Sequence, residues 1–245
     1  GESLWEELRR LPERDRTVLH LYYYEDMTTE EIAKLLDRNP ATVRSQLLRA
    51  RAKLKKLLVE GEAEIEYLAT VLYEVESAPG EAALNEIRAE LKSQGYLKYY
   101  KQRDKRQKPA DFLHYRSSDG FEILVGRNNT QNDKLTLHTA RGKDLWFHVQ
   151  KAPGSHTVVL SYGQDIPDTT KQEAAELAVL HSSVGGGAKV PVDTTEVRNI
   201  KKPAGAKPGM VVYEVYTTVY VTPRPSLEEQ LRRNETAFRR DGAGK

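Results

Sequence analysis

The sequence predicts a multidomain protein in which an all-α helix-turn-helix domain is followed by a helical hairpin linker and then by an α+β domain. Apolar residues recur at helical spacing through the first third of the chain, and short alternating apolar runs replace them after Pro109. One amphipathic helix, expected at 171–184, interrupts those runs, and strands with one interposed helix make an α+β domain. The expected domains are 1–58 (helix-turn-helix), 59–97 (helical hairpin), 98–110 (basic linker), 111–225 (α+β) and 226–245 (polar helix and tail).

Composition excludes several classes of protein before any motif is considered. The 245 residues contain no cysteine, which excludes disulfide frameworks, thiolate zinc sites and cysteine nucleophiles. No apolar run approaches the roughly 20 residues that a membrane helix needs, so a cytoplasmic protein is expected. Charge is segregated, because residues 61–92 carry eight acidic and two basic side chains while residues 93–108 carry six basic and one acidic. Such blocks are either solvated faces or an electrostatic footprint for nucleic acid.

Capping residues mark the helix boundaries in the first domain. Thr28 and Glu31 have the capping-box pattern at the start of a short helix. Asn39 is a typical helix cap and Pro40 suits a first turn, so a long basic helix is expected to run from there to about Leu58. Two helices joined by a tight turn, the second of them basic, predict a helix-turn-helix whose second helix lies in the major groove of DNA.

Helical spacing divides this basic helix into two faces. The residues expected to face inward are Val43, Leu47, Ala50 and Leu54. The candidate DNA contacts on or near the outer face are Thr42, Arg44, Ser45, Gln46, Arg49, Arg51 and Lys53. Arginine can bond guanine bidentately and glutamine can bond adenine, while lysines suit phosphates. The alternative interpretation is an ordinary helical hairpin with a basic solvated face.

The stretch LPERDRTVLHLYYYEDMTTEEIAKLLDRNPATVRSQLLRARAKLKKLL covers nearly all of the first sixty residues. It resembles region 4 of bacterial sigma factors of the extracytoplasmic-function group. This resemblance implies that the helix from Ala41 recognises a promoter −35 element and that the domain docks on the flap of the RNA polymerase β subunit.

The second and third domains read as packing and linker elements. A helical hairpin is expected because apolar stripes flank the break at 78–80, and these stripes comprise Ile65, Leu68, Leu72, Val75, Leu84, Ile87 and Leu91. The basic run KYYKQRDKRQKP follows, with Tyr99 and Tyr100 interleaved among its cations. Such a run either combines base stacking with phosphate contacts on RNA or is a solvated linker.

The last third reads as strands. FLHYRS and FEILVG, separated by a Ser-Asp-Gly turn, predict a β-hairpin, and LWFHV, HTVVL and VVYEVYTTVYV predict further strands. The end of the chain is polar, and it predicts a short helix followed by a frayed tail.

Three strings of this domain carry candidate polar contacts, and each has a structural alternative. Residues 126–129 combine a guanidinium with two amides. These groups can contact phosphates and base edges, or they can cap a hairpin. His148 and His156 lack a third ligand or a paired carboxylate, so neither a metal site nor a catalytic site is predicted. These imidazoles and Ser155 are expected to bond backbone or phosphate, and a buried, hydrogen-bonded structural histidine is the alternative. The loop 201–209 is basic and rigid, as expected of a phosphate contact or of a hairpin connection.

The strings DGFEILVGRNNTQND, WFHVQKAPGSH, VPVD and KKPAGAKPG resemble the NFACT-R domain, the RNA-binding module of NFACT proteins of the RqcH type. The resemblance runs from about Val59 to Arg224 and meets the sigma-like region near Leu58. It implies a non-enzymatic protein without cofactors that binds tRNA and obstructed large ribosomal subunits in ribosome quality control, where the full-length family supports alanine tailing. The implied RNA contacts are Arg127, Asn128, Asn129, His148, Lys151, Ser155, His156, Lys201, Lys202 and Lys207.

Two further functions stay open at this point. A sigma-like transcription factor would use residues 1–58 to bind promoter DNA and RNA polymerase. An enzyme that acts on RNA is the weaker alternative, because no acid–base pair or metal-ligand set stands out in the sequence.

Overall fold

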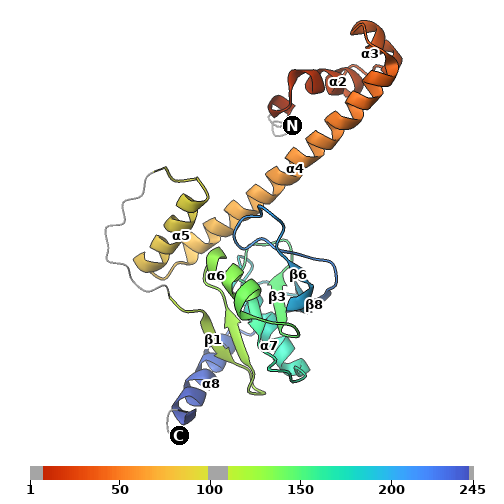
Figure 1. Ribbon diagram of the computed structural model, residues 1–245. Coiled ribbons are helices and arrows are strands. Elements are labelled where there is room, and N and C mark those ends of the chain that lie inside the picture. The colour runs from red at the N-terminus through yellow and green to blue at the C-terminus, as the bar shows by residue number, and fades with distance from the viewer. Residues whose placement is uncertain (1–7, 99–109, 243–245) are drawn as a thin grey trace. The chain divides into compact units, whose positions relative to one another are not determined.

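The structure is a computed structural model that describes residues 8–98 and 110–242. Contacts between residues divide the chain into two compact units, Gly1–Ile65 and Glu66–Lys245 (Figure 1). Most of the predicted basic linker at 98–110, including Tyr99 and Tyr100, lies outside the described residues. Within the described ranges, no helix has both the length and the apolar character needed to cross a membrane.

The first unit contains the predicted helix-turn-helix. Its helices are α2 (Glu13–Tyr23), α3 (Thr29–Leu35) and the first part of α4 (Pro40–Ser77). The capping box is confirmed, because the Thr28 hydroxyl accepts a hydrogen bond from the amide of Glu31 and the Glu31 carboxylate accepts one from the amide of Thr28. The amide of Ala41 donates to Asn39 Oδ1 at 2.8 Å. The buried core consists of Leu11, Val18, Leu19, Ile32, Ala33, Val43, Leu47 and Ala50.

Helix α4 does not end near Leu58, as the sequence predicted, but continues without a break to Ser77. The residues around Leu58 are mostly good helix formers, and the single Gly61 costs only about 1 kcal/mol in a helix interior. The break comes at 78–80, where Pro79 cannot continue the helix, and α5 (Glu81–Ser93) follows. The meeting point of the two predicted domains therefore lies inside one helix.

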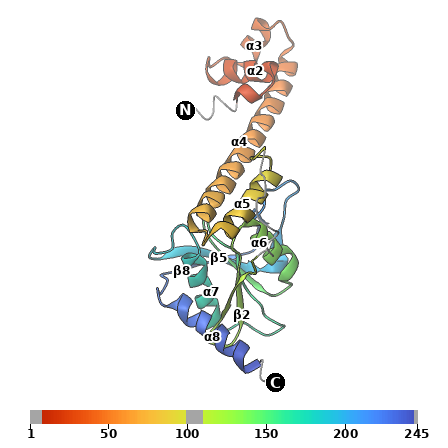
Figure 2. The ribbon, with the colours of Figure 1, turned by 90° about the vertical axis from the view of Figure 1, so that its left-hand side faces the viewer.

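The end of α4 packs against α5 as the predicted hairpin, and Figure 2 shows the two helices side by side. The residues buried between them are Tyr67, Val71 and Ile87 rather than the predicted stripe on α4. That stripe, which comprises Ile65, Leu68, Leu72 and Val75, is exposed in the described structure. The tyrosine determines which face turns inward, because its ring stacks on Tyr96 and its hydroxyl donates to Glu90.

A six-stranded antiparallel sheet forms the centre of the second unit. Its strands are β1 (Leu113–Arg116), β2 (Glu122–Val125), β3 (Leu145–Val149), β4 (Thr157–Val159), β5 (Val190–Glu196) and β8 (Thr217–Val221), in the order β1-β2-β4-β3-β5-β8. The predicted β1–β2 hairpin is confirmed, with Leu113 opposite Val125. Strand β5 was not predicted, because Pro191 and Asp193 interrupt its alternating pattern and both residue types are rare in strands. The run VVYEVYTTVYV forms two strands, β8 and β7 (Val212–Tyr213), and the latter pairs with β6 (Ile200–Lys201).

Helices cover one face of this sheet, and short elements cover the other. Helices α7 (Asp168–Leu180) and α8 (Leu227–Gly242) pack on the face that carries Phe147 and Val149 (Figure 2). Trp146, which points the opposite way on β3, is buried with Leu135 of the π-helical segment η1 (Lys134–Thr139). Helix α7 corresponds to the helix predicted at 171–184, but it begins and ends a few residues earlier.

Candidate nucleic-acid interface

The loop after β2 brings the predicted amides of Asn128 and Asn129 together, but it turns them inward. Asn128 caps α6 (Asn129–Asp133), because its Oδ1 accepts a hydrogen bond from the amide of Gln131 at 2.9 Å. Its Nδ2 donates to Glu86 Oε2 of α5 at 2.8 Å, and the residue is only 4% exposed. Protein groups therefore engage both polar atoms of the Asn128 side chain in this structure.

Glu90 of α5 collects the remaining donors of this loop. Its carboxylate accepts hydrogen bonds from Asn129 Nδ2 (3.3 Å), Thr130 N (3.1 Å), Thr130 Oγ1 (2.8 Å) and Tyr67 Oη (2.9 Å). The sequence did not indicate Glu86 and Glu90 as site residues, because acidic residues on a helix usually form a solvated face. The helical spacing offered a signal, since Glu90 lies three residues after Ile87 on the same face.

The predicted basic loop 201–209 is fastened to the rest of the unit. Lys202 Nζ donates to both oxygens of Asp133 at 2.8 and 3.0 Å. Lys207 Nζ lies 4.7 Å from the ring centre of Tyr96, a cation–π contact. Gly209 has φ +78°, and a Cβ there would meet Asn129 Oδ1 at 2.3 Å, so only glycine allows this approach. Lys201, in contrast, is exposed.

The two predicted histidines lie together as expected, with ring centres 5.6 Å apart and Trp146 against both. His156 is 3% exposed, and its Nδ1 pairs with the hydroxyl of Thr136 at 2.7 Å. His148 Nε2 lies 3.2 Å from the carbonyl oxygen of Gly154. Burial lowers the pKa of both imidazoles, so they are neutral at physiological pH and offer no positive charge to a phosphate.

Four of the predicted RNA contacts keep surface groups free for a ligand. Arg127 donates through Nε to the carbonyl oxygen of Asp111 at 2.7 Å, and no described residue pairs with its two terminal nitrogens. Lys151 and Lys201 are exposed, and the half-buried Ser155 has no side-chain hydrogen bond to any described residue. The cationic members of the predicted set therefore divide into three exposed groups and two lysines bound by the protein.

The predicted DNA-contact face of α4 is exposed at five of its seven positions. These are Thr42, Arg44, Ser45, Arg49 and Lys53. The prediction for Gln46 is wrong, because this residue is 3% exposed. Its Nε2 donates to the carbonyl oxygen of Arg14 at 2.7 Å, and its Oε1 accepts from Arg38 at 2.8 Å, so the amide holds the helices together. Arg51 is half-buried, with its guanidinium 4.9 Å from the ring centre of Tyr22.

Two of the exposed cations on this face are paired with acidic residues of the same unit. Arg44 bonds Glu30 at 2.9 Å, and Lys53 bonds Asp15 at 2.6 Å. The Arg44–Glu30 pair is exposed on both sides and is worth about 0–1 kcal/mol, so a phosphate can replace Glu30 at little cost. Asp15 is buried, so a phosphate that takes Lys53 from it would leave a buried carboxylate unpaired. Arg49 makes no ion pair with any described residue.

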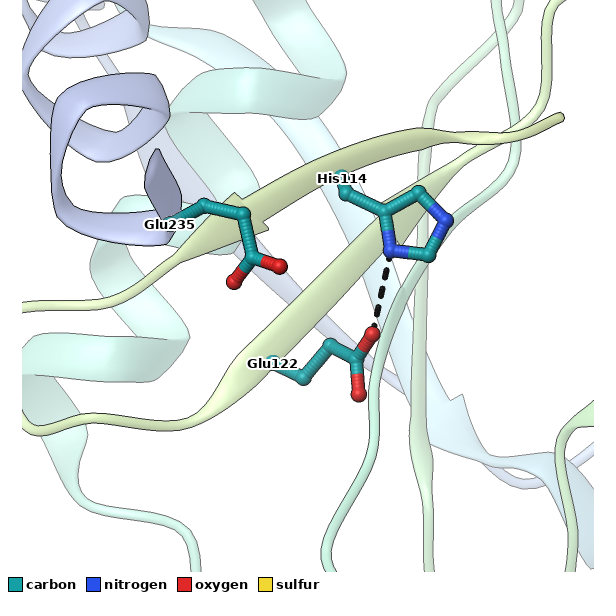
Figure 3. A group of neighbouring side chains, drawn as sticks. All are labelled: His114, Glu122 and Glu235. Carbon is teal, nitrogen blue, oxygen red and sulfur yellow. Dashed lines mark hydrogen bonds and ion pairs between the residues drawn. The ribbon is translucent and has the colours of Figure 1, made fainter. Parts of the chain in front are cut away.

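One group of potential metal ligands occurs among the described residues, and Figure 3 shows it: His114, Glu122 and Glu235. Each ligand atom already has a protein partner. Glu122 accepts from His114 at 3.1 Å and from Tyr162 at 2.6 Å, while Glu235 accepts from Arg116 at 2.8 Å and from Arg239 at 2.6 Å. This network fastens α8 to the β1–β2 hairpin, and the adjacent arginines oppose a divalent cation.

Comparison with known families agrees with this arrangement. The profile of the NFACT protein RNA binding domain matches residues 111–214, and the profile of the NFACT N-terminal and middle domains matches residues 44–110. A third profile, of sigma-70 region 4, matches residues 1–54. The solved C-terminal part of the fibronectin/fibrinogen-binding protein of Streptococcus suis aligns at 32% identity and a TM-score of 0.74, over 94% of this chain and 93% of that one.

This chain belongs to the NFACT family. Curated relatives carry the name Rqc2 homolog RqcH. The relative from Bacillus subtilis is 35% identical over 96% of this chain and 42% of its own length, and the relative from Streptococcus pneumoniae (strain D39) is 39% identical over 91% and 41%. The chain thus spans about two fifths of the curated relatives that it matches.

These alignments also bear on residues 1–58. The alignments with the RqcH relatives cover 91–96% of the chain. The part that they leave out is much smaller than residues 1–58, so the alignments include some of these residues. The NFACT resemblance therefore extends beyond the predicted limit at Val59 and into the region that the sigma-70 profile also matches. An unbroken α4 across Leu58 is consistent with that extension.

Proposed function

We propose that this NFACT protein is a non-enzymatic RNA-binding protein of the RqcH type, which contacts tRNA and the obstructed large ribosomal subunit in the cytoplasm. The match of the NFACT RNA binding domain to residues 111–214 supports this proposal most directly. Its relatives named RqcH support the assignment to ribosome quality control. The exposed cations Arg127, Lys151 and Lys201 supply the phosphate contacts.

These contacts are expected to be electrostatic and insensitive to RNA sequence. Lysine contacts a phosphate as a point charge and reads no base edge. Each neutralised phosphate releases counterions, so the affinity falls linearly with salt on logarithmic axes. The buried Asn128, Asn129 and His156 contribute by holding the exposed groups in place.

Replacing Lys201 by alanine is expected to weaken tRNA binding equally for all tRNA sequences and to reduce the slope of log affinity against log salt by about one. The measurement is fluorescence anisotropy of labelled tRNA with the intact chain over a salt series, repeated with purified large subunits. Lys171→Ala is the matched control, because Lys171 is an exposed lysine on α7 at the opposite face of the sheet. Equal affinities and salt slopes for the two variants would contradict the assignment of Lys201.

The sigma-70 match at residues 1–54 supports a second candidate function, recognition of promoter DNA. Arg44 and Arg49 are the exposed arginines on the face of α4 that would enter the major groove. Replacing either by alanine is expected to cost about 1–3 kcal/mol of promoter affinity and to relax the preference at one base pair.

A binding assay with a library of −35-type duplexes measures this loss. Gln46 is unsuitable for the test, because removal of its buried hydrogen bonds would perturb the helices themselves. Arg240→Ala near the end of α8 serves as the control, since this exposed arginine lies in the other compact unit. Promoter affinity that stays the same in Arg44→Ala, Arg49→Ala and Arg240→Ala would exclude this candidate.

A further inference from the structure

A groove of about 580 Å³ lies between the turn that joins α4 to α5 and the loop that precedes α6. We call it the hairpin groove. Its polar lining includes Glu74, Glu81, Glu86, Arg127, Ser155 and Arg232, and its apolar lining includes Tyr73, Ala78, Pro79, Ala82, Ile87 and Leu113. A volume of this size is within the range of sites that hold small organic ligands.

Two residues of the hairpin groove offer hydrogen-bond donors that have no partner among the described residues, and a third, Arg232, is only partly engaged. The two terminal nitrogens of Arg127 and the hydroxyl of Ser155 make no hydrogen bond to any described residue. Arg232 also lines the groove, and its guanidinium is largely exposed even though it contacts Glu228. The first turn of α5 faces the same space, and no side chain caps it because its N-cap is Gly80.

Each carboxyl group that lines the groove either has protein partners or is neutral. Glu81 is held by an ion pair with Arg88, and both oxygens of Glu86 accept hydrogen bonds, from Asn128 Nδ2 and from the amide of Ala110. Burial, followed by the charge of Glu90, raises the pKa of Glu74 to about 9, so this carboxyl group is neutral at physiological pH. Glu86 keeps its charge, because both of its partners are neutral, and Arg232 is paired with Glu228. Within the described ranges, the groups left free for an anionic oxygen are the terminal nitrogens of Arg127 and the hydroxyl of Ser155.

The remaining wall suits a flat apolar ring. Tyr73 is half-buried, and alanine, proline and isoleucine side chains of the α4–α5 hairpin continue the surface beside it. Nucleic-acid bases stack on tyrosine without regard to base identity, because every base has a π face. A phosphate group attached to a base therefore matches both halves of the lining.

We propose that the hairpin groove binds one unpaired nucleotide of an RNA strand, with its phosphate at Arg127, Ser155 and Arg232 and its base against Tyr73. This inference rests on the proposed RNA-binding function and deepens it, because it assigns a single-stranded element to a defined pocket. The same chemistry is present in a free nucleotide, so the test compares the two sources.

The test titrates the intact chain with adenosine and uridine 5′-monophosphate by calorimetry and with a labelled single-stranded RNA hexamer by anisotropy. Arg127→Ala removes the guanidinium whose two terminal nitrogens are unpaired in the described structure. Ala82→Trp fills the groove from an exposed position on α5 and leaves the charge unchanged. The control is Arg141→Ala, since Arg141 is an exposed arginine outside the groove.

Saturable binding of both monophosphates is expected, with a loss of at least about tenfold in Arg127→Ala and in Ala82→Trp and a change of less than about twofold in Arg141→Ala. The affinity for the hexamer should fall in the same two variants. Circular dichroism must show that the variants are folded.

Two results would overturn the inference and leave RNA binding intact. The first is hexamer binding by a chain that binds neither monophosphate, and the second is equal affinities in all variants. If the monophosphates bind and respond to Arg127→Ala but the hexamer affinity does not change, the groove takes free nucleotides and the RNA assignment is wrong. A chain that binds the monophosphates but no RNA at all would instead refute the proposed function.

Discussion

Replacing Glu90 by alanine is expected to lower the free energy of unfolding of the second unit by about 3 kcal/mol, because one substitution leaves four donors without an acceptor. Glu90 is 5% exposed and accepts hydrogen bonds from Tyr67, from Asn129 and from both the amide and the hydroxyl of Thr130. Water cannot easily replace the lost carboxylate at the buried donors of Tyr67 and Asn129, and each unsatisfied buried group costs free energy. The amide of Thr130 cannot turn elsewhere without breaking the start of α6.

Urea unfolding followed by tryptophan fluorescence measures this effect, in a Trp5→Phe background so that only the buried Trp146 reports. The matched control is Glu76→Ala, which removes an exposed glutamate from the same helical hairpin and should change stability by less than about 0.5 kcal/mol. A similar loss of stability in both variants would show that the hydrogen bonds to Glu90 contribute little.

Replacing Glu74 by leucine is expected to have the opposite effect and to raise the free energy of unfolding by about 1–3 kcal/mol near pH 8. Glu74 is 4% exposed, and neither of its carboxyl oxygens has a hydrogen-bond partner among the described residues. Leucine has a similar volume and nothing to desolvate, so the substitution removes a cost without opening a cavity.

The same substitution is expected to flatten the dependence of stability on pH. Burial first, and then the charge of Glu90, raises the pKa of Glu74 in the folded protein to about 9, from an ordinary value of 4.5. The folded state therefore keeps a proton that the unfolded chain releases above about pH 4.5. This contribution to stability is complete below about pH 4.5 and is lost as the pH rises to about 9.

Urea unfolding at several pH values inside this window measures the slope. The informative control is Glu74→Gln, which is neutral at every pH but keeps an unpartnered polar group in the same place. It should flatten the pH dependence as leucine does, without the full gain in stability. A parent protein whose stability does not fall between about pH 5 and pH 9 relative to Glu74→Leu would contradict a buried neutral carboxyl group at this position.

Glu74 and Glu90 show what the fold does with the acidic residues of the α4–α5 hairpin. Both are neighbours in a buried layer, yet one saturates four donors and the other none. A sequence pattern cannot separate them, because helical spacing tells which side of a helix a residue occupies and not which groups another element brings to it. From the sequence, this acidic block is therefore either a solvated face or part of an electrostatic footprint.

In the candidate RNA site, too, the sequence does not separate exposed residues from residues that are held by protein partners. The sequence singled out Arg127, Asn128, Lys201 and Lys202 by residue type and by resemblance. Only the structure separates the exposed Arg127 and Lys201 from Asn128, which caps α6, and from Lys202, which Asp133 neutralises. Long-range partners make the difference, since Asp133 lies 69 residues from Lys202 in the chain.

The amino-acid sequence by itself determined the order of the helical and α+β regions, the helix caps at Thr28 and Asn39, the β1–β2 hairpin and the NFACT family, because these depend on local periodicity, capping chemistry and short strings of residues. Tertiary structure alone decided that α4 continues past Leu58, that Gln46 is buried, and which glutamates hold the hairpin against the β2–α6 loop. Those outcomes depend on burial and on hydrogen bonds between distant segments, and folding brings these segments together only after each local element has been specified.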